Sequence, residues 1–192
     1  MKNVFFAAVL LFCIFSPLQA QYLKTGYRGM VETGFGVGNA FDRDEYGSDS
    51  DLFGVHLETS TTHGYQFNPY LFLGGGVGAL LRSLTEDGGT FPFFVDFRAN
   101  FNKKRFSPYG VLKIGYSTNP EKELNGGVYI NTALGYRFGL HKKLAINVSL
   151  GYLHQQTDYY KSGGVFCLLF CRPESISRGA LNAFTVRAGF EF

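Results

Sequence analysis

The last eleven residues of the chain, Asn182 to Phe192, read NAFTVRAGFEF and decide the fold. Counting back from Phe192, every second residue is apolar as far as Phe184, whereas the residues between them, such as Arg187, are polar or small. A period of two predicts a β-strand with one apolar face. In water, a strand with three exposed phenylalanines would favour edge-to-edge aggregation, so both its face and its edge need covering. A lipid bilayer covers such a face and closure into a barrel removes the edge, so the stretch predicts a transmembrane β-barrel.

The N-terminus predicts export. Lys2 is followed by an unbroken apolar run from Val4 to Phe15, and small residues lead to Ala20. The run is too short to span a bilayer and is typical of a secretory signal peptide. We therefore expect residues 1–20 to be a cleaved signal peptide and residues 21–192 to form one outer-membrane β-barrel domain.

Composition narrows the class further. The chain contains 25 Gly, 12 Tyr and 21 Phe, and glycines with aromatics favour strands and tight turns over helices. Without Lys2 the mature chain carries 17 basic (18 minus 1) and 15 acidic side chains, a net charge of +2, so no nucleic-acid partner is indicated. No later apolar run reaches the length of a membrane helix, whereas a transmembrane barrel distributes its apolar residues by alternation.

Alternation of apolar and polar residues predicts eight strands. They span residues 27–37, 53–60, 70–81, 91–102, 111–117, 128–138, 144–152 and 182–192. Long loops are predicted at 39–51, 82–90, 119–127 and 155–181, and short turns after the second, fourth and sixth strands, the first of them at 63–69. Short turns on one side and long loops on the other are typical of outer-membrane barrels, whose termini and short turns lie in the periplasm. The predicted fold class is all-β, an eight-stranded antiparallel up-and-down transmembrane β-barrel.

The third strand is apolar throughout, so alternation alone does not decide which way its side chains face. We place Leu71, Leu73, Val77 and Ala79 toward lipid, and Tyr70 and Phe72 inside. Its GGGVGA segment, residues 74–79, matches a dinucleotide-binding pattern, but an exported chain without a βαβ unit favours glycines that make space in a barrel wall.

Five stretches carry a resemblance to a known family: GYRGMVETGFGVG (26–38), THGYQFNPYLFLGGGVG (62–78), FPFFVDFRANF (91–101), VSLGY (148–152) and FTVRAGFEF (184–192). With them, the mature chain resembles the small outer-membrane β-barrel proteins of Bacteroides-type Gram-negative bacteria and, more distantly, OmpX-like and OmpA-like eight-stranded barrels with a porin-like fold. The resemblance implies residence in the cell outer membrane and implies no particular activity. It also implies that the barrel-assembly machinery reads the terminal strand through Phe184, Val186, Ala188, Phe190 and Phe192.

Ten charged or titratable residues fall on the inward face by parity. They are Arg28, Glu32, His56, Glu58, Asp96, Arg98, Lys113, Arg137, Arg187 and Glu191. Eight strands leave an interior only wide enough for side chains, and buried charges of both signs must pair. We therefore interpret the set as a salt-bridged, packed interior, and an open diffusion pore is disfavoured.

A lipid A-modifying enzyme is the alternative, because some barrels of this size deacylate lipid A with Ser, His and an acid on the outer wall. By parity His154 faces outward near the outer end of the seventh strand. Gln156 stands where that family's Ser would follow, so no nucleophile is paired with the base. We predict no catalytic residue and no enzymatic activity.

Cys167 and Cys171 are the two cysteines of the mature chain, and export favours a disulfide between them. Residues four apart in an extended strand are separated by roughly 13 Å, beyond disulfide reach, so the bond requires a helical turn or a bend. The sequence leaves the bonded and the free state open. A metal site is disfavoured because two thiols lack nearby His or Cys partners.

These observations predict a non-enzymatic, monomeric barrel with a structural or cell-surface interaction role and with neither cofactor nor metal. The expected partners are outer-membrane lipids, lipopolysaccharide and the barrel-assembly machinery. An extracellular or accessory protein is a further expected partner, through loops 39–51 and 155–181. The first of these loops is acidic but lacks the spacing of a calcium-binding loop, so we interpret it as a solvated surface.

Overall fold

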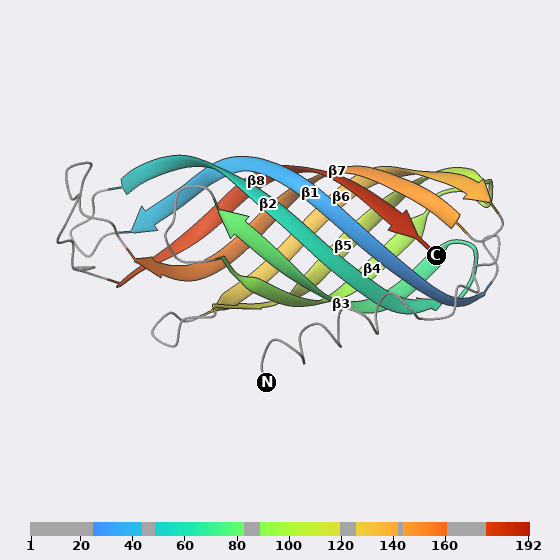
Figure 1. Ribbon diagram of the computed structural model, residues 1–192, viewed down its shortest axis with the longest axis horizontal. Coiled ribbons are helices and arrows are strands. Elements are labelled where there is room, and N and C mark those ends of the chain that lie inside the picture. The colour runs from blue at the N-terminus through green and yellow to red at the C-terminus, as the bar shows by residue number, and fades with distance from the viewer. Residues whose placement is uncertain (1–24, 44–48, 83–88, 120–125, 142–143, 161–175) are drawn as a thin grey trace, which may run out of the picture.

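A computed structural model describes residues 25–43, 49–82, 89–119, 126–141, 144–160 and 176–192 (Figure 1). Side chains are described for these residues except 40–43, 49–53, 141, 157–160 and 176–179. The predicted signal peptide, residues 1–20, lies outside the described residues, as do Cys167 and Cys171.

The eight strands form one closed antiparallel barrel in sequence order, which confirms the predicted fold class. They are β1 (Gly26–Arg43), β2 (Asp49–Gln66), β3 (Leu71–Arg82), β4 (Phe91–Asn100), β5 (Phe106–Thr118), β6 (Gly127–His141), β7 (Leu144–Tyr160) and β8 (Ile176–Glu191). The links after β2, β4 and β6 lie at the same end of the barrel as the C-terminus, which we call the short-turn end (Figure 1). The other four links lie at the opposite end, the loop end. Within the described ranges, no helix is long and apolar enough to cross a bilayer.

The terminal strand closes the barrel. In β8, Phe190 lies opposite Ile146 of β7 on one side and Val31 of β1 on the other. Beyond the strand, Gly29 and Phe192 exchange two backbone hydrogen bonds, each 2.9 Å between nitrogen and oxygen. The strand edge that the sequence predicts to need covering is therefore paired along both sides.

Several strands are longer than their apolar pattern predicts. β1 continues to Arg43, β2 begins at Asp49 and runs to Gln66, and β7 runs to Tyr160. The predicted loops 39–51 and 155–181 and the predicted turn 63–69 are therefore wrong in part, since each contains strand residues. Polar segments without alternation still satisfy their backbone N–H and C=O groups by pairing, as Phe41 does with Asp51.

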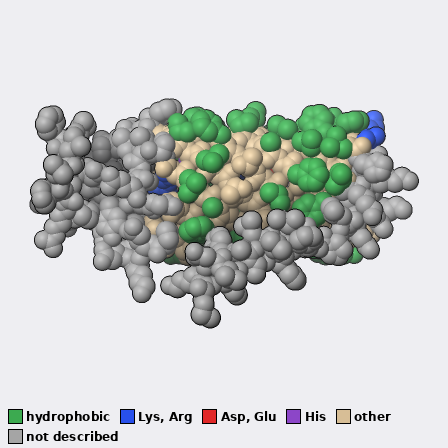
Figure 2. Space-filling model, in the orientation of Figure 1, with side chains coloured by type: hydrophobic (Ala, Val, Ile, Leu, Met, Phe, Trp, Pro, Cys, Tyr) green, Lys and Arg blue, Asp and Glu red, His purple; other side chains and the backbone are tan. Residues whose placement is uncertain are grey.

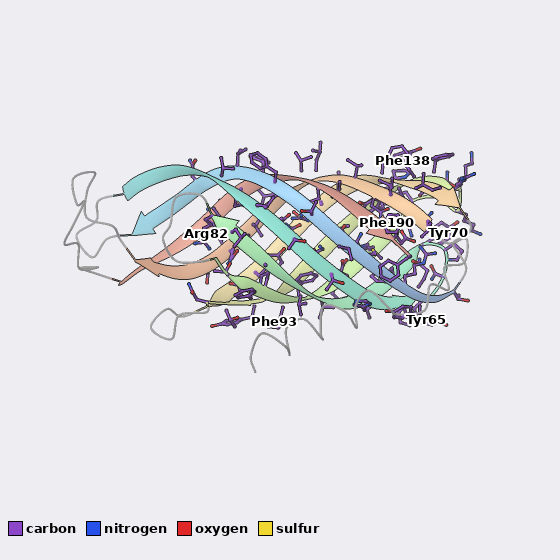
Figure 3. The ribbon with its side chains drawn as sticks, in the orientation of Figure 1. Tyr65, Tyr70, Arg82, Phe93, Phe138 and Phe190 are labelled. Carbon is purple, nitrogen blue, oxygen red and sulfur yellow. The ribbon has the colours of Figure 1, made fainter. Side chains whose placement is uncertain are left out.

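The outward face of the strands is apolar around the wall (Figure 2). The large side chains most exposed there are Phe184 at 72 %, Leu134 at 68 % and Leu150 at 65 %. Aromatic residues gather toward the short-turn end, where Figure 3 labels Tyr65, Tyr70, Phe138 and Phe190. Such an aromatic band at the edge of an apolar wall is typical of a membrane interface.

The facing of β3 follows the prediction except at Tyr70. Leu71 and Val77 face outward and Phe72 is buried inside the barrel. Tyr70 is exposed and precedes the strand, so its predicted inward placement is wrong. The reason is a turn, in which the Oδ1 atom of Asn68 accepts hydrogen bonds from the backbone N–H groups of Tyr70 and Leu71, both at 2.8 Å.

Two neighbouring glycines in β3 give a matched test of interior packing. A Cβ atom at Gly76 would lie 2.5 Å from the ring of Phe94 and 2.7 Å from the carbonyl of Thr61, whereas at Gly75 it would meet nothing within 4 Å. We expect Gly76→Val to lower the free energy of unfolding by about 1–3 kcal/mol, because overpacking forces the backbone and the ring apart. Gly75→Val should stay within about 0.5 kcal/mol, as surface changes usually do. Urea titrations of both variants in lipid vesicles measure the difference, and equal losses would contradict this packing.

Candidate functional site: the barrel interior

The structure places all ten inward residues of the sequence prediction in the barrel interior. Every one is buried, with exposed fractions from 0 % for Asp96 to 8 % for Glu58. They come from β1, β2, β4, β5, β6 and β8, because alternate residues of every strand point inward. Nine of them form three clusters of ion pairs along the barrel, and His56 forms none.

The first cluster lies near the short-turn end and is centred on Glu191 of β8. Its carboxylate accepts hydrogen bonds from Arg137 Nε at 2.9 Å and Nη2 at 3.0 Å, a two-pronged contact that fixes both side chains. Arg28 of β1 makes a second ion pair with the same carboxylate, and Asn147 Nδ2 donates to it at 3.4 Å. One acid therefore serves two arginines from different strands.

The second cluster occupies the middle of the barrel and is built on Glu32 of β1. Its Oε2 atom accepts from Arg98 Nη2 at 2.8 Å and from Lys113 Nζ at 2.6 Å. Arg98 also donates through Nη2 to Asp96 Oδ2 at 2.8 Å. The Lys113 ammonium lies 4.7 Å from the ring centre of Phe94, a favourable cation–π contact. Two acids thus balance two bases, linking β1, β4 and β5.

The third cluster pairs Glu58 of β2 with Arg187 of β8. Arg187 also donates to Asn131 Oδ1 at 2.6 Å and to Thr185 Oγ1 at 3.2 Å. These side chains pass over Gly34, where a Cβ atom would lie 2.6 Å from Arg187 Cγ. The pair therefore depends on a glycine in the strand between its partners.

His56 is the one predicted network member without an ion pair or hydrogen bond in the described part of the chain. Its ring is buried against Gly36, where a Cβ atom would lie 2.1 Å from Cε1. Both ring nitrogens lack a hydrogen-bond partner there. The structure therefore assigns His56 a packing position beside the third cluster.

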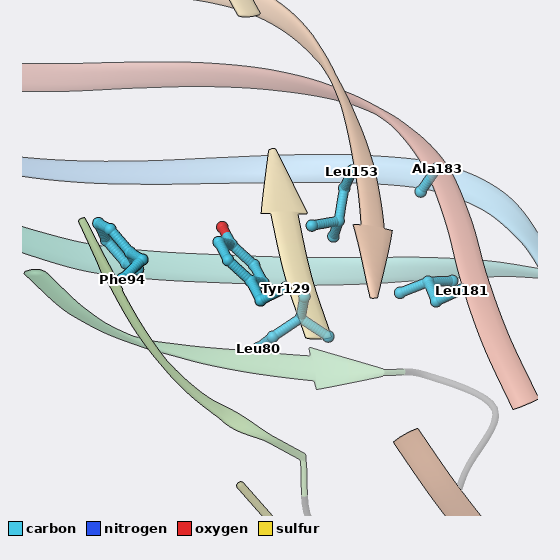
Figure 4. Close-up of a cluster of buried hydrophobic side chains, with 6 residues drawn as sticks. All are labelled: Leu80, Phe94, Tyr129, Leu153, Leu181 and Ala183. Atoms are coloured by element: carbon cyan, nitrogen blue, oxygen red, sulfur yellow. The ribbon is translucent and has the colours of Figure 1, made fainter. Parts of the chain in front are cut away.

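An apolar plug lies in the interior toward the loop end, and the sequence analysis did not identify it. It consists of Leu80, Phe94, Tyr129, Leu153, Leu181 and Ala183 (Figure 4). The rings of Phe94 and Tyr129 stack with centroids 5.7 Å apart. The signal was present as apolar residues at inward parity positions, but their grouping depends on five different strands. Plug and ion pairs together fill the interior.

On the outer wall, His154 and Asn182 form the arrangement closest to a catalytic pair. Asn182 Oδ1 lies 2.7 Å from His154 Nδ1 and accepts a hydrogen bond from the Tyr152 hydroxyl at 3.0 Å. The pair is a direct cross-strand contact between β7 and β8. The described residues contain no group of three or more His, Cys, Asp or Glu side chains that could hold a metal ion.

Comparisons with known proteins agree with this architecture. A family model described as "Outer membrane protein beta-barrel domain" matches residues 5–192. Among solved structures, the chain is similar to the crystal structure of Neisserial surface protein A, with a TM-score of 0.51 and 8 % sequence identity. That alignment covers 86 % of this chain and 97 % of the other, and at this identity it supports the fold alone. No curated protein matches the sequence.

Proposed function

Because the chain belongs to the outer membrane protein beta-barrel domain family, we propose that it is a closed, non-enzymatic barrel with a structural or cell-surface interaction role. The apolar outer wall anchors the protein in the outer membrane. The interior gives rigidity, and the four links at the loop end are the surface available to partners. Catalysis and solute transport have no part in this role.

The filled interior is the observation that carries the proposal. Charged clusters occupy the short-turn end and the middle of the barrel, and the apolar plug closes the section toward the loop end. The cavity found at the short-turn end has a volume of about 10 Å³, space for roughly one water molecule. Such an interior supports a load-bearing wall and disfavours a water-filled path.

The remaining parts of the proposal concern export, orientation and partners. Residues 1–20 direct export, and the short-turn end lies in the periplasm, as is usual when short turns alternate with longer loops. The protein is a monomer of a Bacteroides-type small barrel, similar to OmpX-like proteins. Its lipid partners are the outer-membrane lipids and lipopolysaccharide, and its protein partners approach from the loop end.

We expect the purified full-length barrel to conduct no ions in planar lipid bilayers above the protein-free baseline. We also expect lipid A from cells with and without the gene to give the same acyl pattern by mass spectrometry. The control is Leu80→Ser with Leu153→Ser, which makes the plug polar and should produce current if water then enters the barrel. Steady conductance by the unaltered protein would contradict a closed role.

A lipid-modifying enzyme is the second candidate, because the 2.7 Å contact with Asn182 can hold the imidazole of His154 in one orientation on the outer wall. Such a base would need a hydroxyl or a water to activate. The nearby Tyr152 hydroxyl already donates to Asn182. A change in lipid A acyl pattern that disappears in His154→Ala would favour this enzyme over the non-enzymatic role.

A further inference from the structure

A small cavity lies inside the barrel at the short-turn end, beside the Glu191 cluster. Its charged walls are Arg28 from β1, Arg98 from β4, Arg137 from β6 and Glu191 from β8. Apolar contacts from Met30 and Phe72 and polar side chains including Tyr109 and Asn147 complete the lining. The volume of about 10 Å³ is space for one species about the size of a water molecule.

Four polar atoms of this lining have no hydrogen-bond partner among the described residues: Arg28 Nη2, Arg98 Nη1, the Tyr109 hydroxyl and Asn147 Oδ1. All four residues are buried, with Arg28 and Arg98 each 4 % exposed. Buried polar groups are normally satisfied, so unsatisfied atoms around one cavity indicate something that the cavity binds. Two of the four are guanidinium nitrogens, which only donate, and a hydroxyl can donate as well.

Charge distinguishes this end of the interior from the rest. In the middle cluster Glu32 and Asp96 balance Arg98 and Lys113. In the third cluster Glu58 balances Arg187. In the first, however, Glu191 alone faces both Arg28 and Arg137, leaving one positive charge in excess. A buried charge without a counter-charge is strongly unfavourable, so an anion is the species that this cavity lacks.

We propose that this cavity binds a single monatomic monovalent anion, of the class of chloride, held by Arg28 Nη2, Arg98 Nη1 and the Tyr109 hydroxyl. The anion neutralises the excess charge and satisfies three donors at once. It also links β1, β4 and β5 across the barrel, so the ion is a structural ligand that stabilises the short-turn end. Asn147 Oδ1 is the one acceptor of the four, and it would be better served by a water, which is therefore the competing occupant.

The direct test is a bromide replacement. Crystals of the full-length barrel grown in sodium bromide should show an anomalous peak within hydrogen-bond distance of Arg28 Nη2 and Arg98 Nη1. A peak at this position confirms the site. Ordinary water density there, with no anomalous signal, overturns it.

Thermal unfolding in detergent gives an independent measure at constant ionic strength. Replacing sodium gluconate by sodium chloride should raise the unfolding midpoint by roughly 5 °C, because an anion that binds only the folded state stabilises it by mass action. Arg28→Gln removes the excess charge but leaves the two-pronged Arg137–Glu191 pair, so this variant should fold and lose the chloride response.

The matched control is Lys104→Gln, which removes an exposed cation from the short turn between β4 and β5. This variant should keep the full chloride response, because Lys104 has no part in the cavity. An equal response in Arg28→Gln and the unaltered protein would assign the effect to surface screening and overturn the proposal. No response in the unaltered protein would overturn it as well.

Discussion

Replacement of Glu32 by Gln is expected to lower the free energy of unfolding by about 3–5 kcal/mol. Glu32 is the only acid in contact with Lys113, whose ammonium otherwise donates to Ser60 Oγ at 3.4 Å within the described residues. Lys113 is 1 % exposed, so the neutral amide leaves a buried ammonium without its counter-charge. Arg98 keeps Asp96, and the middle cluster then carries one positive charge in excess.

Reversible urea unfolding in lipid vesicles, followed by the shift of the folded band on unheated gels, measures this loss. The matched control is the double variant Glu32→Gln with Lys113→Met, which restores neutrality with a side chain of similar length. It should recover a large part of the lost stability, because Arg98 and Asp96 remain paired. If the single and the double variants lose equal stability, the loss does not come from the uncompensated lysine.

Replacement of Leu134 by Arg is expected to lower the free energy of folding into bilayers by about 2–4 kcal/mol, because an arginine at mid-membrane depth faces hydrocarbon. Leu134 is 68 % exposed and lies halfway along the outward residues of β6, from Val128 to Leu140. Folding yield and urea midpoint in vesicles report the change.

Leu140→Arg is the matched control, on the same strand and the same face but beside the short-turn end. There the charge reaches the lipid headgroups, so the expected cost falls to about 0–1 kcal/mol. Equal costs at the two positions would contradict a hydrocarbon layer around the apolar wall. A gradient with depth is the signature of a bilayer, because no protein partner would impose the same dependence on strand position.

Local alternation carries much information in this chain. The pattern FPFFVDFRAN, residues 91–100, predicts β4 to within two residues and assigns Asp96 and Arg98 to the interior. The same reasoning works for β8, where Arg187 and Glu191 alternate with phenylalanine, valine and alanine. It fails where apolar residues lie on both faces, as in β3, and where polar strand ends lose alternation, as in β1 beyond Val37.

The sequence by itself determined the strand number, the direction of most side chains and the closed barrel, because a period of two is a local property of successive residues. Only the tertiary structure decided which buried charges meet, such as Glu32 with Lys113 of a distant strand, or Glu191 with both Arg28 and Arg137. It also decided that Leu80, Leu153 and Leu181 form one plug. The physical reason is closure: contacts across the interior depend on how strands are tilted and staggered around the barrel, and no single strand encodes that geometry.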